Sequence, residues 1–165
     1  MTFIEKFQKT TDMKHWPGDM EVDHFFYTAG VAGEIFFTAL RDKGAILGAR
    51  CESCGVVYVP PRIYCEDCFG ELRENAYIDV GLRGQVRSFT VARLGKDGQE
   101  LKKPEIFAII GLGPKSTGFL HKLGEITPAA VRVGLEVKAV LKPKAEREGH
   151  ITDIAYFRPA AKGNR

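Results

Sequence analysis

The sequence contains no cysteine outside residues 51–68, only one tryptophan and four histidines among its 165 residues, and no long apolar run. A helix that spans a bilayer needs about 20 consecutive apolar residues, so we expect no membrane segment. Low-complexity tracts and fixed-period repeats are also absent, which excludes solenoid and compositionally biased classes. With 44% apolar and 27% charged residues, the composition is that of a soluble globular protein. No signal peptide is visible at the N-terminus, so we expect a cytoplasmic protein.

Several catalytic signatures are missing as well. The sequence has no G-x-S-x-G, no P-loop and no G-x-G-x-x-G, the motifs of serine hydrolases, phosphate-binding loops and dinucleotide-binding folds. The histidines are His15, His24, His121 and His150, and none lies in an H-E-x-x-H frame or beside a serine nucleophile. We therefore predict no catalytic residue in this chain.

What the sequence does have is two C-x-x-C steps separated by ten residues. One such step lets two thiolates from a tight turn reach the same ion, and two steps complete a tetrahedral four-thiolate shell. The spacing therefore predicts a structural metal site with no open position for a substrate. Its ligands would be Cys51, Cys54, Cys65 and Cys68.

Turn residues flank both steps. Gly55 follows the first step directly and Gly70 lies just beyond the second, where turns often need a positive φ. Two disulfides are an alternative that suits an oxidising compartment. A thioredoxin-type redox pair would need one step that opens a helix. Zinc is the default ion, and a single iron also suits four thiolates.

The net charge of +3 conceals an asymmetry along the chain. Residues 1–80 carry 8 Lys and Arg against 13 Asp and Glu, a balance of −5, whereas residues 81–165 carry 16 against 8, a balance of +8. The basic C-terminal half suits an anionic ligand. Nucleic acid, an acidic protein face and a phosphate-bearing cofactor all meet this condition, and charge alone does not choose among them.

Residues 1–44 hold 8 of the 17 aromatic residues. From about Gly33 to Lys43 the apolar residues recur with helical spacing, and Gly44 is a plausible stop. A segment this small has too little core to bury so many rings by itself. The rings either cover the rest of the protein or form a docking face for another chain, since aromatic residues are enriched at interface cores. The candidate docking residues are Phe25, Phe26, Tyr27, Phe36 and Phe37.

Short alternating or apolar segments between glycine and proline turns predict strands in the rest of the chain. Two of them belong to a zinc ribbon over residues 45–80, namely Ala45–Arg50 and Val56–Val59, and the segment Tyr77–Val80 leads out of it. Five more follow over residues 81–160, at 85–93, 106–112, 118–123, 135–142 and 150–157, with residues 161–165 as a tail. Thr127 and Pro128 predict a short helix of one turn before Val131, after the third of these five. This order matches the OB-fold, so the fold class is mainly β, with an N-terminal helical segment.

The chain resembles a family of small proteins that join a rubredoxin-like zinc ribbon to an OB-fold and accompany thiolases and related acyl-CoA enzymes. The resemblance covers about residues 25–160. Within this family, the chain resembles the small subunit of a thiolase such as the one that cleaves benzoylsuccinyl-CoA. The matching stretches are Phe36-Phe37-x-x-Leu40 with Gly44, Arg50-Cys51-x-x-Cys54-Gly55, Pro60-Pro61 with Cys65-x-x-Cys68, Gly84-x-Val86-x-Ser88-Phe89-Thr90, Ile126-Thr127-Pro128 with Val133-Gly134-x-x-Val137, and Tyr156-Phe157-x-Pro159.

The resemblance implies a non-catalytic subunit that docks a thiolase-like catalytic subunit in a hetero-oligomer. A thiolase needs a nucleophilic cysteine, and none is left once the ribbon binds its metal. The basic barrel would face CoA or acyl-CoA, whose phosphates suit Lys and Arg. The candidate CoA-binding residues are Arg87, Arg93, Lys102, Lys103, Lys115 and Lys122.

A module that binds single-stranded nucleic acid is the alternative function, because zinc ribbons and OB-folds both bind strands elsewhere. Such OB-folds stack bases on exposed aromatic rings and track the backbone with positive charge. The rings of the barrel half lie mostly in core patterns, and most other rings lie in the acidic half. A purely structural scaffold between two enzymes is a third interpretation, which the sequence does not separate from the first.

Overall fold

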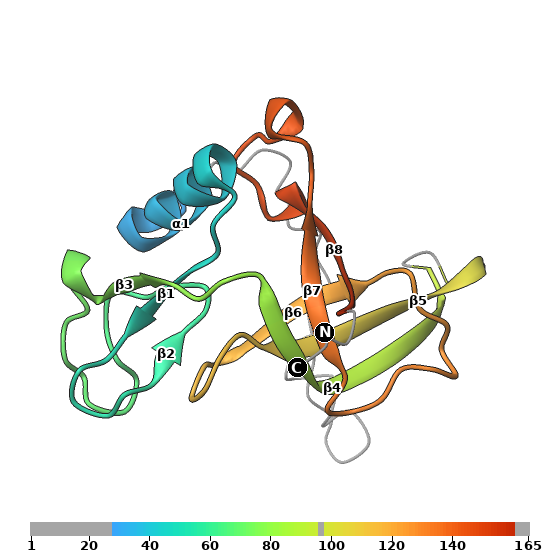
Figure 1. The fold of residues 1–165 in the computed structure, drawn as a ribbon, viewed down its shortest axis with the longest axis horizontal. Coiled ribbons are helices and arrows are strands. Elements are labelled where there is room, and N and C mark those ends of the chain that lie inside the picture. The colour runs from blue at the N-terminus through green and yellow to red at the C-terminus, as the bar shows by residue number, and fades with distance from the viewer. Residues whose placement is uncertain (1–27, 96–97, 161–165) are drawn as a thin grey trace, which may run out of the picture.

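A computed structural model describes residues 28–95 and 98–160. The described residues form one α-helix, a small three-stranded sheet that carries the cysteines, and a closed five-stranded barrel. Figure 1 shows the helix and the small sheet at one end of the molecule and the barrel at the other. The predicted fold class, mainly β with an N-terminal helix, a ribbon and a five-stranded barrel, is confirmed. No helix within the described residues is long and apolar enough to cross a bilayer.

The helix α1 spans Gly30–Lys43 and ends where the sequence predicts. Gly44 adopts φ 66°, and its N–H donates to the carbonyls of the last helical turn. Glycine adopts this left-handed conformation without steric cost, which makes it a common helix terminator. Phe36 and Leu40, four residues apart, form the buried face of the helix.

The placement of α1 corrects one of the predicted docking residues. The side chain of Phe36 is fully buried in the core, so it presents no surface to another chain. Phe37 is half-buried beside it, with the two ring centroids 5.2 Å apart in an edge-on arrangement. The helix contacts residues 47–50 and 151–153, and its apolar face lies in the core cluster that it shares with the barrel, so this face is used within the molecule. Phe25, Phe26 and Tyr27 lie outside the described residues.

The ribbon sheet has the order β2-β1-β3. Its strands are β1 (Leu47–Arg50), β2 (Val57–Tyr58) and β3 (Tyr77–Asp79), with a short 3-10 helix, η2 (Glu74–Ala76), before β3. Both pairings of the central strand β1 are antiparallel. Gly48 allows close packing there, because a Cβ at this position would lie 2.8 Å from a methyl group of Val57.

The barrel closes in the order β4-β5-β6-β8-β7. Four of its contacts are antiparallel, and β6 runs parallel to β8 where Leu123 pairs with Phe157. This is the Greek-key order of an OB-fold. The strands are β4 (Arg83–Leu94), β5 (Glu100–Gly111), β6 (Gly118–Leu123), β7 (Glu136–Leu141) and β8 (Ile154–Pro159), and two 3-10 helices, η3 (Lys144–Glu146) and η4 (Ile151–Asp153), separate the last two.

The one-turn helix predicted after the third barrel strand is present as a hydrogen-bonded turn and not as a regular helix. The segment forms a single turn, closed by the bond from the Ala130 N–H to the Thr127 carbonyl at 3.0 Å. The chain then has to return to β4, because the Gly134 N–H donates to the Val86 carbonyl and the Val86 N–H to the Leu135 carbonyl. A continuing helix would use these backbone groups internally.

The last strand begins four residues later than predicted. Asp153 is fully buried, and its carboxylate accepts the N–H groups of Glu148, Gly149 and His150 at 2.8–3.2 Å. This arrangement holds residues 148–153 as a compact loop and 3-10 turn, so the strand starts only at Ile154.

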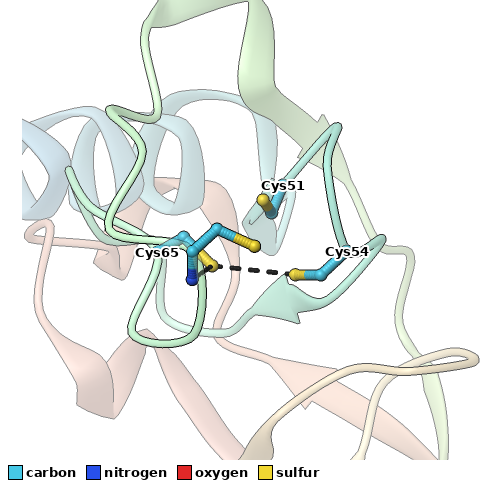
Figure 2. A group of neighbouring side chains, drawn as sticks. Cys51, Cys54 and Cys65 are labelled. Atoms are coloured by element: carbon cyan, nitrogen blue, oxygen red, sulfur yellow. Dashed lines mark hydrogen bonds between the residues drawn. The ribbon is translucent and has the colours of Figure 1, made fainter.

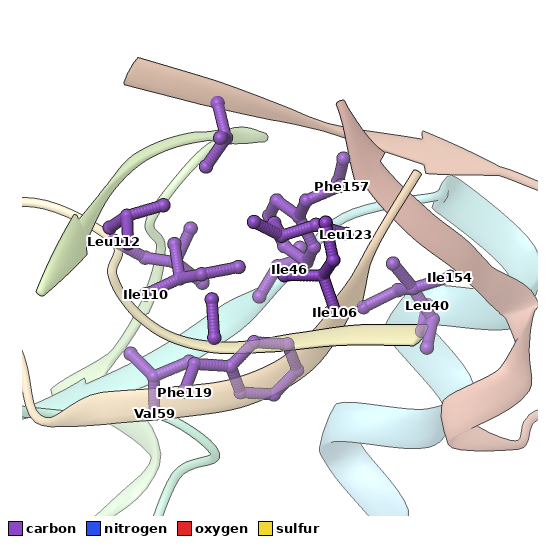
Figure 3. Close-up of a cluster of buried hydrophobic side chains, with 14 of the residues drawn as sticks. Leu40, Ile46, Val59, Ile106, Ile110, Leu112, Phe119, Leu123, Ile154 and Phe157 are labelled. Atoms are coloured by element: carbon purple, nitrogen blue, oxygen red, sulfur yellow. The ribbon is translucent and has the colours of Figure 1, made fainter. Parts of the chain in front are cut away.

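One cluster of buried apolar side chains joins the three parts of the molecule. Leu40 of α1 and Val59 after β2 belong to the same cluster as Ile110 and Phe157 of the barrel (Figure 3). Because the ribbon contributes side chains to the barrel's own core, a change in the ribbon should alter the packing of the barrel. The domain boundaries predicted at residues 44 and 80 stay predictions.

Candidate metal centre and the basic hollow beside it

The first cysteine knuckle is a tight turn closed by two backbone hydrogen bonds. The Gly55 N–H donates to the Cys51 carbonyl at 2.9 Å, and the Cys51 N–H donates to the Val56 carbonyl at 2.9 Å. Gly55 adopts φ 75°, as the sequence predicts. The turn therefore projects both of its cysteines to one side, towards the second knuckle.

The second knuckle repeats these hydrogen bonds, but a phenylalanine stands where the first knuckle has glycine. The Phe69 N–H donates to the Cys65 carbonyl and the Cys65 N–H to the Gly70 carbonyl, both at 2.9 Å. The residue with positive φ is Phe69, at 56°, and not Gly70 as the sequence predicts. The turn position decides this, since Phe69 is the fifth residue of its knuckle, as Gly55 is of the first.

The four cysteine sulfurs converge on one point. All four Sγ atoms lie within 4.8 Å of one another, and the Cys54 and Cys65 sulfurs are 3.7 Å apart (Figure 2). A tetrahedral ion with metal–sulfur bonds of about 2.3 Å requires sulfurs about 3.8 Å apart. All four cysteines are free, so the disulfide interpretation does not describe this structure. The predicted convergence of the four cysteines on one metal site is confirmed.

Tyr58 is a fifth member of the site that the sequence analysis missed. Its buried hydroxyl lies 3.3 Å from the Cys65 sulfur and accepts the Glu66 N–H at 2.9 Å. The hydrogen bond from Tyr58 lowers the pKa of Cys65 to about 6, and the same contact raises the pKa of Tyr58 to about 12. The thiol of Cys65 therefore ionises easily. The sequence feature that could have identified Tyr58 is a tyrosine on the apolar strand between the two knuckles.

The remaining sulfurs show why this cluster requires a cation. The neighbouring thiol of Cys54 raises the pKa of the exposed Cys68 to about 12. Four thiolates this close repel one another, so the fully ionised set is favourable only around a positive ion. The donor set thus fits one metal ion in a closed four-sulfur shell, which supports folding and leaves no position for a substrate.

The residues that follow the first knuckle in the sequence hydrogen-bond the ribbon to the barrel. The Val57 N–H donates to the Lys115 carbonyl at 3.0 Å, and the Thr117 N–H donates to the Val57 carbonyl at 2.8 Å. The Thr117 hydroxyl also accepts the Val59 N–H at 2.8 Å and donates to the Val59 carbonyl at 3.2 Å. The strand that leaves the metal knuckle therefore fixes the segment that leads into β6.

That segment forms one wall of a basic hollow of about 580 Å³. We use this name for the open cavity lined by Arg83, Arg87 and Lys115, in which Glu136 is the one carboxylate among the described residues. Three cations against one anion make the hollow a favourable place for a negatively charged group.

Arg87 is held in position within the basic hollow. Its guanidinium donates to the Ser116 carbonyl at 2.6 Å and to the Ser116 hydroxyl at 3.2 Å. Ser116 is itself buried and donates to the Gly113 carbonyl at 3.0 Å. Gly111 leaves the space that the guanidinium occupies, because a Cβ there would lie 2.4 Å from Arg87 Nε. A fixed guanidinium loses less entropy when it binds an anion.

Of the six predicted CoA-binding residues, only Arg87 and Lys115 line the basic hollow. Arg93 is exposed at the far end of β4, opposite an irregular stretch of β5 that contains Lys102 and Lys103. Lys122 forms an ion pair with Glu105. Arg83 completes the basic hollow and was missed because the predicted strand began at residue 85. A strand extended by two residues would have placed Arg83 in period with Arg87.

The barrel's aromatic rings do not form an exposed row. Phe119 and Phe157 are buried, Phe107 and Tyr156 are half-buried, and Phe89 is exposed. Single-stranded nucleic acid stacks successive bases on exposed rings. Among the described residues of the barrel, no run of such rings exists.

The fold and the four-sulfur site define a class of protein, a metal ribbon joined to an OB-fold barrel. The family described as the ChsH2 rubredoxin-like zinc ribbon domain matches residues 38–73. A DUF35 domain-containing scaffold protein of Methanocaldococcus jannaschii is 29% identical over 126 residues, which cover 73% of this chain and 85% of that protein. A protein of the same description from Methanothermobacter thermautotrophicus is 29% identical over 119 residues, covering 69% and 86%.

Several solved structures resemble this one. A DUF35-family protein of unknown function from Sulfolobus solfataricus has 32% sequence identity and a TM-score of 0.55, covering 67% of this chain and 78% of that chain. This chain therefore belongs to the DUF35 family. An Ltp2-ChsH2(DUF35) aldolase has 20% identity and a TM-score of 0.54, covering 77% of this chain and 93% of that chain, a likeness that concerns the fold alone.

Proposed function

We propose that this protein is a non-catalytic accessory subunit of an acyl-CoA enzyme complex. The catalytic partner would be a thiolase-like subunit, and this chain would dock it and help to bind or gate acyl-CoA. The scaffold description of its DUF35 relatives supports the accessory role. The partnership named in the Ltp2-ChsH2(DUF35) aldolase supports a place beside an enzyme subunit.

The observation that carries the proposal is the basic hollow. It offers three cations, and no cysteine, histidine or serine contributes to its wall within the described residues. Such a site binds an anion and provides no nucleophile to attack it. CoA fits this chemistry, because its phosphates are separated by the pantetheine arm from the sulfur atom that carries the acyl group. The nucleophile would then come from the partner.

The metal belongs to the supporting structure in this proposal. Cys51, Cys54, Cys65 and Cys68 would hold zinc, with iron as the alternative that metal analysis of the purified protein distinguishes. The ion would fix the first knuckle and, through Val57, the segment that carries Lys115. The ion would take no part in acyl transfer.

Calorimetric titration of the full-length chain with CoA tests the ligand. Arg87→Ala and Arg83→Ala should each weaken CoA binding at least about tenfold, the cost of one charge-assisted hydrogen bond. Arg93→Ala is the matched control, since it removes an exposed arginine from the far end of the same strand. Equal losses in all three variants, or none, would contradict a CoA site in the basic hollow. The resemblance makes benzoylsuccinyl-CoA the first thioester to compare with CoA.

Co-purification tests the partnership. A tagged chain expressed with its genomic neighbours should purify with a larger subunit that catalyses an acyl-CoA reaction. A monomer whose stability does not change with any acyl-CoA would contradict the proposal. Partner binding without CoA binding, in the chain or in the complex, would indicate a scaffold that has no ligand of its own. Salt-dependent binding of a labelled oligonucleotide near physiological ionic strength would instead favour the nucleic-acid alternative.

A further inference from the structure

Phe69 combines two unfavourable features in one residue. Its side chain is 83% exposed, and its backbone adopts φ 56° at the turn position that glycine occupies in the first knuckle. A bulky side chain is uncommon in this conformation, which glycine or asparagine adopts with less strain. Neither feature helps the isolated chain to fold. Residues kept in unfavourable conformations tend to lie at functional sites.

Two more large apolar side chains are exposed on the same knuckle. We define the second knuckle as residues 63–72, and within it Ile63 is 48% and Tyr64 is 55% exposed. Both line an open groove of about 540 Å³, to which Val31 at the start of α1 also contributes. The matching stretch of the first knuckle, residues 49–58, exposes no large apolar side chain. The asymmetry between two knuckles with the same backbone hydrogen bonds indicates a surface specific to the second one.

The charges around this surface are mainly negative. Residues 62–74 carry two arginines and four acidic residues, a net charge of −2. Arg62 pairs with Glu66, and Arg73 pairs with Glu71 at 2.8 Å. Asp67 and Glu74 are exposed beside them. A complementary partner surface would therefore be apolar at its centre and basic at its rim.

We propose that the second knuckle, with Phe69 as its anchor, is the surface on which this protein binds its catalytic partner, through an apolar pocket rimmed by Lys or Arg. This inference rests on the accessory role proposed above. The metal ligands Cys65 and Cys68 hold the turn, so Phe69 is presented in a fixed position. An anchor that is rigid before binding loses little entropy in the complex. Aromatic anchors of this kind carry a large share of the binding energy at interfaces.

Substitutions at Phe69 separate binding from folding. Phe69→Asn removes the ring and suits the left-handed backbone, so its melting temperature should equal or exceed that of the wild type. Its Kd for the purified catalytic subunit should rise at least about thirtyfold, the loss that defines a hot-spot residue. Phe69→Tyr keeps the ring and should bind within about threefold of the wild type. Val133→Asn, which removes a 62% exposed apolar side chain from the barrel, is the control and should bind normally.

Hydrogen exchange of the full chain, free and in the complex, gives an independent measurement. Amides of residues 63–72 should become protected on binding. Wild-type affinity in Phe69→Asn, or no protection of the second knuckle, would overturn the docking inference and leave the accessory role intact. A wild-type chain that binds no catalytic subunit would contradict the accessory role itself. Phe69-dependent self-association in sedimentation would identify a second copy as the occupant and would also overturn the inference.

Discussion

Tyr58 links the strand between the knuckles to the chemistry of the metal ligands. Its hydroxyl contacts the Cys65 sulfur and the Glu66 N–H, so it orients one ligand and stabilises the thiolate of that ligand. Partners of metal ligands commonly influence metal affinity by tenfold or more.

Tyr58→Phe should weaken metal binding by about tenfold. Without this hydrogen bond the pKa of Cys65 rises from its value of about 6, so protons compete with the metal at higher pH. The pH at which half of the metal is released should therefore move upward, which competition with a chromophoric chelator across pH measures. Tyr64→Phe, which changes an exposed tyrosine of the same ribbon, is the control. An unchanged release pH in Tyr58→Phe would contradict this role.

Asp153 makes the stability of the folded protein depend on pH in the acidic range. Burial by itself raises its pKa, and the N–H donors of Glu148, Gly149 and His150 lower it further than burial raises it, so the net direction is down. A carboxyl group whose pKa is lower in the folded state contributes stability above its unfolded pKa of about 3.9. This stability is lost as the pH falls through the folded value.

Asp153→Asn should destabilise the protein by about 2 kcal/mol at neutral pH, because the amide replaces an acceptor with a donor. Its free energy of unfolding should also fall less than that of the wild type between about pH 5 and pH 3. Urea denaturation at several pH values measures both quantities. Parallel stability curves for the two proteins would show that Asp153 is not the group responsible.

At the scale of elements, the contact between β2 and the segment before β6 joins the ribbon to the barrel. Thr117→Val keeps the shape of this side chain and removes its two hydrogen bonds to the Val59 backbone. Because Val59 is buried, unpaired groups there should cost about 1–3 kcal/mol in chemical denaturation. Thr90→Val, at an exposed position of β4, should change the stability by less than about 0.5 kcal/mol. Equal effects of the two substitutions would contradict the proposed junction.

The elements also show how far the sequence could be interpreted. The metal site was predictable because C-x-x-C geometry is local and needs no knowledge of the fold. The end of α1 at Gly44 and the strand Gly118–Leu123 were equally local. The element expected at Thr127 is a hydrogen-bonded turn and not a regular helix, because β4 pairs with the backbone groups that follow it, and a sequence does not reveal such distant partners. The positive φ at Phe69 was missed because the neighbouring Gly70 suggested the wrong turn position.

Side-chain sites depended still more on tertiary structure. Arg87 and Lys115 are 28 residues apart and meet only because the ribbon holds the segment before β6 against the barrel. Phe36 and Phe37 are adjacent in an aromatic segment, yet helix packing buries one completely and leaves the other half-exposed. Composition identified the basic half of the chain, and only the barrel's register showed which of its cations converge.

At the scale of the whole molecule, the shared core makes the metal a determinant of overall stability. Val57 and Val59, which flank Tyr58, belong to the barrel's core cluster. Removal of the metal by a chelator should lower the melting temperature of the full chain by at least about 10 °C, since structural metal binding contributes several kcal/mol. Hydrogen exchange should accelerate at residues 115–117 as well as in the ribbon. Faster exchange confined to residues 47–79 would show that the barrel is independent of the metal.

The central claim is that this chain uses all of its cysteines to bind a metal and assists an acyl-CoA reaction that another chain performs. Native mass spectrometry of the complex purified through a tag on this chain tests that claim most directly. We expect one metal ion for each copy of the chain, bound to a larger acyl-CoA enzyme subunit. A metal-free monomer, or a lone chain that forms a covalent acyl adduct on one of its cysteines when acyl-CoA is added, would contradict the account.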